Sequence, residues 1–218
     1  MDRCSFLTGS ITATISIWFD GNKVLSKIEF CGRVCYKSEE RMTADSAKKF
    51  VRGIIQSGHE SVLEHFSFSV RFVVSRAIAN EIVRHRIASY SQESTRYCNY
   101  KNRGVEIVIP QNMNDYYNYE WICGVADEAY KELLENGYKP EIARGILPLD
   151  LKTELIMTTN LREWRHFLKL RCDSHAHPEM RRVTIPLLYE LYTLIPVVFD
   201  DIYASIHNEA AEDGKQEV

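Results

Sequence analysis

The chain lacks the glycine-rich and nucleophile motifs that identify several large enzyme classes. Its ten glycines are never closer than five residues apart, so the G-x-G-x-x-G dinucleotide fingerprint is missing. The Walker A phosphate loop and the G-x-S-x-G nucleophile elbow are missing as well. Any dinucleotide must therefore bind through some other device.

Cysteine pairs and long apolar runs are also scarce. The six cysteines contain no C-x-x-C pair, which excludes zinc-ribbon and thioredoxin-type spacing. The first residues lack the apolar stretch of a signal peptide, and no run approaches membrane-spanning length. We therefore expect reduced thiols and a cytoplasmic protein.

The charge balance gives no global attraction to nucleic acid or membrane. The 218 residues are 45% hydrophobic and 26% charged, which is ordinary for a soluble globular protein with a substantial core. Twenty-seven basic against 30 acidic residues give a net charge of −3. The segment 71–103, however, holds seven basic and two acidic residues, which suggests a small anionic ligand better than a polyanion.

Hydrophobic periodicity predicts a mixture of strands and helices. Apolar residues alternate along 11–19 and 66–74, and 105–109 and 151–159 are further strand candidates. Helical spacing or flanking signals predict helices over the ranges 24–35, 43–57, 75–83, 116–135, 140–145, 162–170 and 178–207.

Smaller signals set the expected boundaries. Asp20-Gly21-Asn22 predicts a turn, Thr43 a helix cap and Gly58 a left-handed helix stop. The polar stretch 87–102 predicts mostly loop, while Pro186 and Pro196 should bend or divide the last helix. We expect one mixed α+β domain over 1–208, followed by a polar, frayed tail over 209–218.

Two histidine patterns raise the question of a metal. His59 and His65 superficially resemble a metalloprotease helix, but six residues turn one about 240° from the other, whereas zinc needs a spacing of four. His175 and His177 with Asp173 are a better candidate, because alternate residues of an extended chain face the same way. The alternative is a polar loop that begins a helix, and no carboxylate cluster accompanies these residues. We predict no metal.

Basic and hydroxyl side chains concentrate between Glu81 and Arg96. If the helix from Ser75 continues, Glu81, Arg84 and His85 share a face and Arg86 points away from Arg84. The planar guanidinium fork suits phosphate oxygens, and the short hydroxyl residues before Arg96 can cradle a phosphate. The alternative interpretation is a solvated helix end and a surface loop.

The arginine segment resembles a known signature. Arg84-His85-Arg86, seven residues and Ser94 match R-H-R-x7-S of the flavin-dependent thymidylate synthases. Residues 57–65 (SGHESVLEH) are similar to the same family's G-H-E-[ST]-x-x-E-H stretch. The segments 143–148, 160–162 and 170–176 resemble its carboxyl-terminal motifs, so the resemblance covers roughly residues 24–186.

The resemblance implies a fold, a reaction and an assembly. The fold would be α+β with a mainly antiparallel sheet flanked by helices. The reaction would convert dUMP to dTMP, with 5,10-methylenetetrahydrofolate as carbon donor, FAD as hydride carrier and NADPH as reductant. Family members are homotetramers with flavin sites between subunits, which explains how a chain without a dinucleotide fingerprint holds FAD.

The resemblance also implies roles for individual residues. Arg171 would be the catalytic residue, a fixed cation against the pyrimidine ring that stabilises negative charge developing on the base. Such a scheme requires no cysteine nucleophile, although Cys172 lies beside it in sequence. The dUMP-binding residues would be Glu81, Arg84, Gln92, Glu93, Ser94, Thr95, Arg96, Arg144 and Arg171. The FAD-binding residues would be Ser61, Glu64, Arg84, His85, Arg86, Gln92, Asn160, Arg162 and His166.

Two positions depart from the family pattern, and two rival functions compete with it. Glu81 stands where many members carry glutamine, and Gln92 where many carry glutamate. One rival is a nucleic-acid-binding module that stacks bases on Tyr90, Tyr97 and Tyr100. The other is a metal-dependent nucleotide hydrolase built on the histidines near Asp173.

Overall fold

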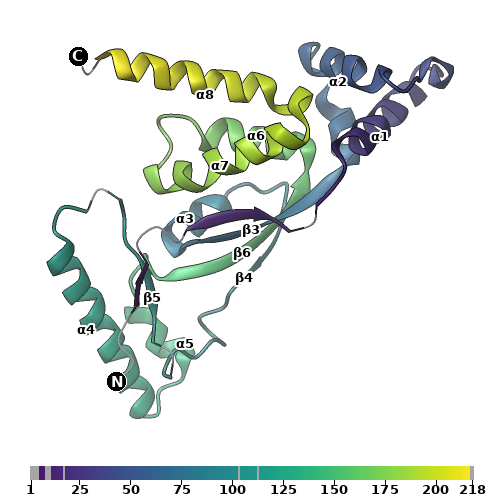
Figure 1. The fold of residues 1–218 in the computed structure, drawn as a ribbon. Helices are drawn as coiled ribbons and strands as arrows, with labels where there is room; N and C mark the ends of the chain where they lie inside the picture. Colours follow the sequence, from purple (N-terminus) through teal and green to yellow (C-terminus); the bar gives the residue numbers. More distant parts are fainter. Residues whose placement is uncertain (1–4, 8–10, 17, 103, 112, 217–218) are drawn as a thin grey trace. The chain divides into compact units, whose positions relative to one another are not determined.

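The protein comprises two compact units, each formed by several segments of the chain. A computed structural model describes residues 5–7, 11–16, 18–102, 104–111 and 113–216 (Figure 1). Unit 1 contains Met1–Thr12, Arg71–Arg86 and Tyr90–Ile156, and unit 2 contains Ala13–Val70, Ile87–Ser89 and Met157–Val218. The prediction of a single domain over 1–208 stays a prediction.

A four-stranded antiparallel sheet has the order β2-β3-β6-β4. Strands β3 (Ser67–Ser75) and β6 (Lys152–Asn160) each contain residues of both units. Alternate residues of β3 are buried, among them Phe68, Val70 and Phe72, as the period of two predicts. The predicted fold class, α+β with a mainly antiparallel sheet and flanking helices, is confirmed.

Unit 1 has its own apolar core. Tyr130 of α4 packs with Ile107 of β5, and both are fully buried. Strand β1 pairs in parallel with β5, so Ser5 lies opposite Glu106. Its elements are β1 (Ser5–Leu7), α3 (Arg76–Ile82), β4 (Ser89–Gln92, whose first residue belongs to unit 2), β5 (Glu106–Val108), α4 (Tyr116–Glu135), α5 (Pro140–Ala143) and the 3-10 helix η3 (Arg144–Ile146).

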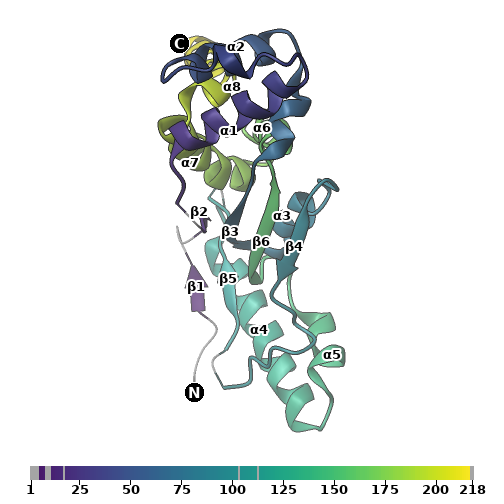
Figure 2. The same ribbon diagram turned by 90° about the vertical axis from the view of Figure 1, so that its right-hand side faces the viewer.

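Unit 2 is mainly helical, and its aromatic core lies where α6 meets β3. Trp164 stacks on Phe68 at 5.0 Å between ring centroids and meets Phe167 edge-on at 5.6 Å. Helices α7 and α8 lie side by side (Figures 1 and 2). Its elements are β2 (Thr12–Ile15, whose first residue belongs to unit 1), α1 (Gly21–Val34), η1 (Glu39–Arg41), α2 (Ser46–Gln56), η2 (Glu60–His65), α6 (Leu161–Arg171), α7 (Pro178–Leu194) and α8 (Pro196–Gln216).

The start of α1 corrects one predicted turn. Asp20 Oδ1 accepts hydrogen bonds from the backbone N–H groups of Asn22 (2.9 Å) and Lys23 (3.4 Å), so Asp20 is an N-cap and the helix begins at Gly21. The strand before it is shorter than predicted and ends at Ile15. A Cβ atom at Gly21 would lie 2.1 Å from the Leu194 carbonyl oxygen, so only glycine fits at this close approach.

Other boundaries were predicted with mixed success. Gly58 has a φ of 71° after α2, which confirms the left-handed stop. Thr43 is not the cap of α2, because the helix begins at Ser46, whose hydroxyl accepts the Thr43 N–H at 2.9 Å. The predicted loop contains strand β4. Pro186 lies inside α7 without ending it, and only Pro196 divides the two helices.

The described residues cover only part of the predicted polar, frayed tail over 209–218. Helix α8 extends to Gln216 and so includes most of the segment expected to be a polar tail. Residues 217 and 218 lie outside the described residues. Fraying of this end stays a prediction. Among the described residues, no helix combines the length and apolar character needed to cross a membrane.

Candidate active site

The R-H-R segment follows the end of a short helix in unit 1. The Ser75 hydroxyl caps α3 by accepting the Ile78 N–H at 3.3 Å. The helix ends at Ile82, so the predicted shared helical face of Glu81, Arg84 and His85 is wrong. Instead, N–H(i)→O=C(i−3) hydrogen bonds continue the chain as a turn from Arg84 N to Glu81 O (3.3 Å) and from His85 N to Ile82 O (3.2 Å).

Tyr90 fixes this turn. Its hydroxyl lies 2.6 Å from the His85 carbonyl oxygen and 3.0 Å from that of Ile82. The His85 side chain is buried, whereas Arg84 and Arg86 are exposed. The backbone is therefore held in place while two guanidinium groups remain accessible to an anion.

The hydroxyl residues before Arg96 form a compact turn that meets a distant segment. The Ser94 carbonyl accepts hydrogen bonds from Tyr97 N (3.1 Å) and Cys98 N (2.8 Å), and the Ser94 hydroxyl accepts the Arg96 N–H at 3.3 Å. Thr95 is buried, and its Oγ1 accepts a hydrogen bond from Arg144 Nη1 at 3.1 Å. The structure thus brings Arg144 to the predicted dUMP segment.

Arg96 has an acidic partner in the same unit. Its Nε lies 3.1 Å from Glu141 Oε2, and both side chains are substantially exposed. Its guanidinium carbon also lies 5.4 Å from the centroid of the Tyr97 ring. An exposed ion pair contributes about 0–1 kcal/mol, so Arg96 is held only weakly by Glu141.

Gln92 and Glu93 are held by residues of β6, α3 and the loop before β5. Gln92 Nε2 and Arg76 Nη1 both donate to Thr153 Oγ1, at 3.4 and 3.3 Å. Arg76 Nη1 also donates to the Glu93 carbonyl at 3.3 Å, and Glu93 Oε1 accepts the Tyr100 hydroxyl at 3.0 Å. Arg76 was not predicted as a site residue, although the basic bias of its region was a signal.

Unit 2 contains a pocket of about 570 Å³ that is lined by four of the residues predicted to bind FAD. The Asn160 side chain caps α6 by accepting the Glu163 N–H at 2.9 Å, and Arg162 Nη1 donates to Glu64 Oε1 at 2.6 Å. The hydrogen bond with Glu64 raises the pKa of Arg162. The predicted residues that line the pocket are Glu64, Asn160, Arg162 and His166, and the others are Glu60, Ile87, Glu163, Arg165, Lys169 and Ile202.

Arg165 supports this pocket instead of presenting its charge to a ligand. It donates to the Val198 carbonyl, to Asp201 Oδ1 and Oδ2 (each 2.8 Å) and to Glu60 Oε1 (3.2 Å from Nη2). Burial by itself would lower the pKa of Arg165, but Asp201 and Glu60 raise it. Arg165 therefore ties α6 to α8 as a fixed cation.

Lys169 is the unpredicted wall residue most suited to an anionic ligand. It follows His166 by three residues on α6, and both side chains are exposed. Helical spacing from Arg162 and His166 could have identified it.

Two predicted residues lie in unit 2 but do not line this pocket. Ser61 is exposed on η2, and Arg171 is the last residue of α6. The Arg171 carbonyl accepts the Thr184 hydroxyl at 2.8 Å, which joins the end of α6 to α7. Cys172 is fully buried, and burial raises the pKa of its thiol to about 12.

The histidines proposed for a metal take part in local structure. His177 Nδ1 accepts the Glu179 N–H at 3.2 Å and caps α7. His175 Nδ1 lies 2.8 Å from Asp173 Oδ1 on an exposed loop. These contacts support the alternative of a polar loop that begins a helix.

The structure exposes fewer tyrosine rings for base stacking than the nucleic-acid interpretation requires. Tyr100 is buried with 5% of its surface exposed, and its hydroxyl contacts Glu93. The Tyr90 hydroxyl is directed at backbone carbonyls. Only Tyr97 presents an exposed ring among the three tyrosines, whereas base stacking along a strand needs successive platforms.

Fold and site together define a class: an α+β protein with exposed arginines and a hydroxyl-rich turn that accepts a hydrogen bond from Arg144. The chain matches the family model "Thymidylate synthase complementing protein" (Thy1) over residues 21–197. It is 35% identical over 185 residues to a flavin-dependent thymidylate synthase of Geobacter sulfurreducens, covering 80% of each chain. It is 36% identical over 204 residues to the enzymes of that name from Mycobacterium bovis and Mycobacterium tuberculosis, covering 84% of this chain and 80% of theirs. The chain belongs to the Thy1 family, which confirms the resemblance.

Proposed function

We propose that this chain is a flavin-dependent thymidylate synthase that reductively methylates dUMP to dTMP. The carbon donor is 5,10-methylenetetrahydrofolate, the hydride carrier is FAD and the reductant is NADPH. The observation that carries this proposal is the folded R-H-R-x7-S segment, directly after which Thr95 accepts a hydrogen bond from Arg144. Family membership supports the same conclusion.

In this proposal, the nucleotide is held mainly by arginine. Arg144 is oriented by Thr95, and Arg96 exchanges Glu141 for a phosphate oxygen. Both guanidinium groups donate charge-assisted hydrogen bonds, which are stronger than neutral ones. The remaining residues assigned to dUMP are Glu81, Arg84, Gln92, Glu93, Ser94 and Arg171.

Arg171 has the catalytic role. A guanidinium beside the pyrimidine stabilises negative charge that develops on the base when C5 becomes nucleophilic. The adjacent Cys172 takes no part, because its buried thiol stays protonated and does not reach solvent.

The pocket of unit 2 suits part of the flavin cofactor, which supplies hydride when bound. Arg162, His166 and Lys169 present cationic or proton-donating atoms to a diphosphate, and Asn160 is held by its capping hydrogen bond. Glu64 accepts a hydrogen bond from Arg162 and so helps to position its guanidinium. The remaining residues assigned to FAD are Ser61, Arg84, His85, Arg86 and Gln92.

The proposal includes a homotetramer in the cytoplasm. Within a chain that lacks a dinucleotide fingerprint, a flavin site completed by a second subunit supplies the missing contacts. Neighbouring subunits of the assembly would contribute those residues.

The experiment is the visible spectrum of freshly purified protein, before and after addition of NADPH without oxygen. We expect a yellow chromophore that bleaches with NADPH, and dTMP formation after dUMP and the folate are added. Protein that stays colourless after incubation with FAD and forms no dTMP would overturn the assignment.

A further inference from the structure

A second cavity in unit 2 is lined by residues that have no role assigned above. Its volume is about 530 Å³, and it is bounded by α1, η1, α2 and His59. The lining residues that the structure describes include three cationic side chains, Arg33, Arg41 and Lys49, and no carboxylate. The chain as a whole has a net charge of −3, so the positive charge of this pocket is opposite in sign to that of the chain.

One wall of this cavity is rigid. Arg33 is 2.7 Å from Glu29 Oε1 through both Nε and Nη2, and the Glu29 side chain is almost fully buried. Glu29 Oε2 in turn accepts the Ser46 hydroxyl at 2.8 Å. The Arg33 guanidinium carbon lies 5.1 Å from the centroid of the Phe50 ring. Glu29 therefore neutralises and fixes Arg33, and the Arg33 guanidinium packs on the Phe50 ring.

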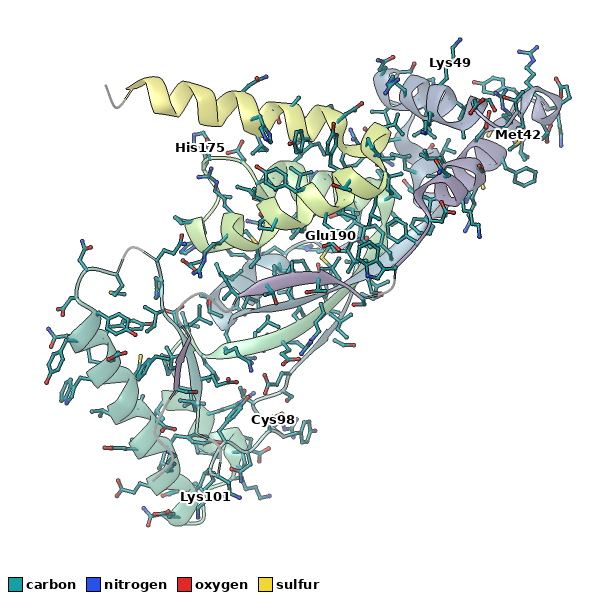
Figure 3. The ribbon with its side chains drawn as sticks, viewed as in Figure 1. Met42, Lys49, Cys98, Lys101, His175 and Glu190 are labelled. Atoms are coloured by element: carbon teal, nitrogen blue, oxygen red, sulfur yellow. The ribbon has the colours of Figure 1, made fainter. Side chains whose placement is uncertain are left out.

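The two other cations have weak or no partners. Arg41 lies 3.6 Å from Glu40, and both side chains are mostly exposed. Lys49 forms no ion pair with any residue that the structure describes. Figure 3 shows Lys49 on α2, where its amine projects from the helix. An anion that enters the cavity can thus gain two charges without disrupting a buried pair.

The face of α2 that lines the cavity contains open space. Ser46, Lys49, Phe50, Gly53 and Ser57 line it at helical spacing. A Cβ atom added to Gly53 would meet nothing within 4 Å. Glycine inside a helix costs about 1 kcal/mol relative to alanine, and no close packing at this position requires it.

We propose that this cavity binds the anionic end of one of the two co-substrates. The Phe50 wall accommodates a planar ring, and Lys49 and Arg41 bind the negative groups attached to it. The required chemistry, an aromatic ring with an anionic tail, occurs in the adenosine phosphate end of NADPH and in the aminobenzoyl-glutamate end of the folate. This assignment rests on the proposed function, which supplies both molecules.

Calorimetric titration of the full-length protein tests the proposal, with 2′,5′-ADP and p-aminobenzoylglutamate as separate probes at low and high salt. We expect one of the two to bind, with an affinity that falls as salt rises. Lys49→Gln should weaken that binding about 2- to 5-fold, the range of an exposed ion pair. Lys48→Gln removes a neighbouring exposed lysine outside the cavity and should change it less than about 2-fold.

A second pair of variants fills space instead of removing charge. Gly53→Leu should reduce probe binding at least about 10-fold by occupying the cavity. Gly124→Leu is the matched control, because Gly124 also lies in a helix, has no neighbour within 4 Å of an added Cβ and lies in the other unit. Circular dichroism verifies that both variants fold.

The possible results separate this inference from the proposed function. Binding of 2′,5′-ADP assigns the cavity to the dinucleotide, and binding of p-aminobenzoylglutamate assigns it to the folate. Wild-type protein that forms dTMP but binds neither probe, or binds one equally well after Gly53→Leu, overturns the inference and leaves the function intact. Wild-type protein that binds a probe through Lys49 but forms no dTMP retains an anion-binding cavity, but it removes the proposed function and with it the assignment to a co-substrate.

Discussion

Arg96 and Arg144 contact partners of different charge, and this difference matters for ligand exchange. Arg144 donates to a neutral threonine hydroxyl, so its full charge is available to a phosphate. Arg96 contacts the carboxylate of Glu141. In the proposed site a phosphate would have to displace this carboxylate, so Glu141 would compete with the nucleotide for one cation.

We expect Arg96→Ala to weaken dUMP binding about 10- to 100-fold, because a charge-assisted hydrogen bond contributes about 1.5–3 kcal/mol. Glu141→Gln should tighten binding by about 2- to 5-fold, since the lost competitor is an exposed ion pair. Calorimetric titration with dUMP measures both effects. Unchanged affinity in Arg96→Ala would remove this residue from the phosphate site.

The cysteines should differ sharply in reactivity. Burial raises the pKa of Cys172 to about 12, so its thiol stays neutral at pH 8, whereas Cys35 is exposed. Iodoacetamide at that pH should modify Cys35 within minutes and leave Cys172 intact, as peptide mass spectrometry would show. Cys172→Ala should retain dTMP formation. Rapid alkylation of Cys172 in folded protein would contradict its assignment as a structural residue.

At the scale of elements, helix starts reveal what local sequence can and cannot predict. Asp20 was predicted in a turn and is a helix cap, because the same side-chain-to-backbone hydrogen bond serves both structures. The alternation in β3 was predicted correctly, since one buried face leaves a period of two in the sequence. Strand β4 was missed because Ser89 to Gln92 are polar and pair with a strand distant in sequence.

The candidate site shows the same division. The family resemblance predicted Arg162 and His166, which meet in one pocket because helical neighbours stay together. Arg76 was missed because its position depends on a partner in the sheet, whereas Lys169 was missed although its helical spacing from His166 was a signal. The roles assigned to the individual residues stay predictions.

Asp20→Ala should lower the free energy of unfolding by about 1 kcal/mol through loss of the α1 cap. Asp20→Ser should retain most of the stability, because serine accepts the same backbone hydrogen bonds. Urea denaturation measures both variants. Equal destabilisation by alanine and serine would show that the cap is not the cause.

The link between α6 and α8 predicts an acid-sensitive contribution to stability. Burial alone would raise the pKa of Asp201, but the hydrogen bond and charge of Arg165 hold it below the ordinary value of 3.8. A lowered carboxyl pKa contributes stability above the unfolded-state pKa, and that contribution is lost as pH falls through the folded-state value. Unfolding free energy should therefore decline below about pH 4.

The matched variant for this link is Arg165→Met. It should lower the unfolding free energy at pH 7 by about 3 kcal/mol, because a buried cation is removed from its partners. The decline below pH 4 should also become shallower. An acid profile identical to that of the wild-type protein would exclude the Arg165–Asp201 pair as its source.

At the scale of the whole molecule, the proposed tetramer makes flavin content depend on assembly. Light scattering should give a mass of about four times the 25.3 kDa chain at micromolar concentration. Dilution that dissociates the particle should release FAD in parallel, because sites completed by a second subunit are lost with it. Flavin retained by isolated single chains would contradict the arrangement.

The close approach at Gly21 has an electrostatic consequence for unit 2. The first turn of α1 carries N–H groups with partial positive charge, two of which Asp20 caps, and the Leu194 carbonyl at the end of α7 carries partial negative charge. Because Gly21 has no side chain, the two helix ends approach closely, and their opposite partial charges attract each other. Position 21 thus lies where two helix ends of opposite partial charge meet, and even a methyl group there would move the two ends apart.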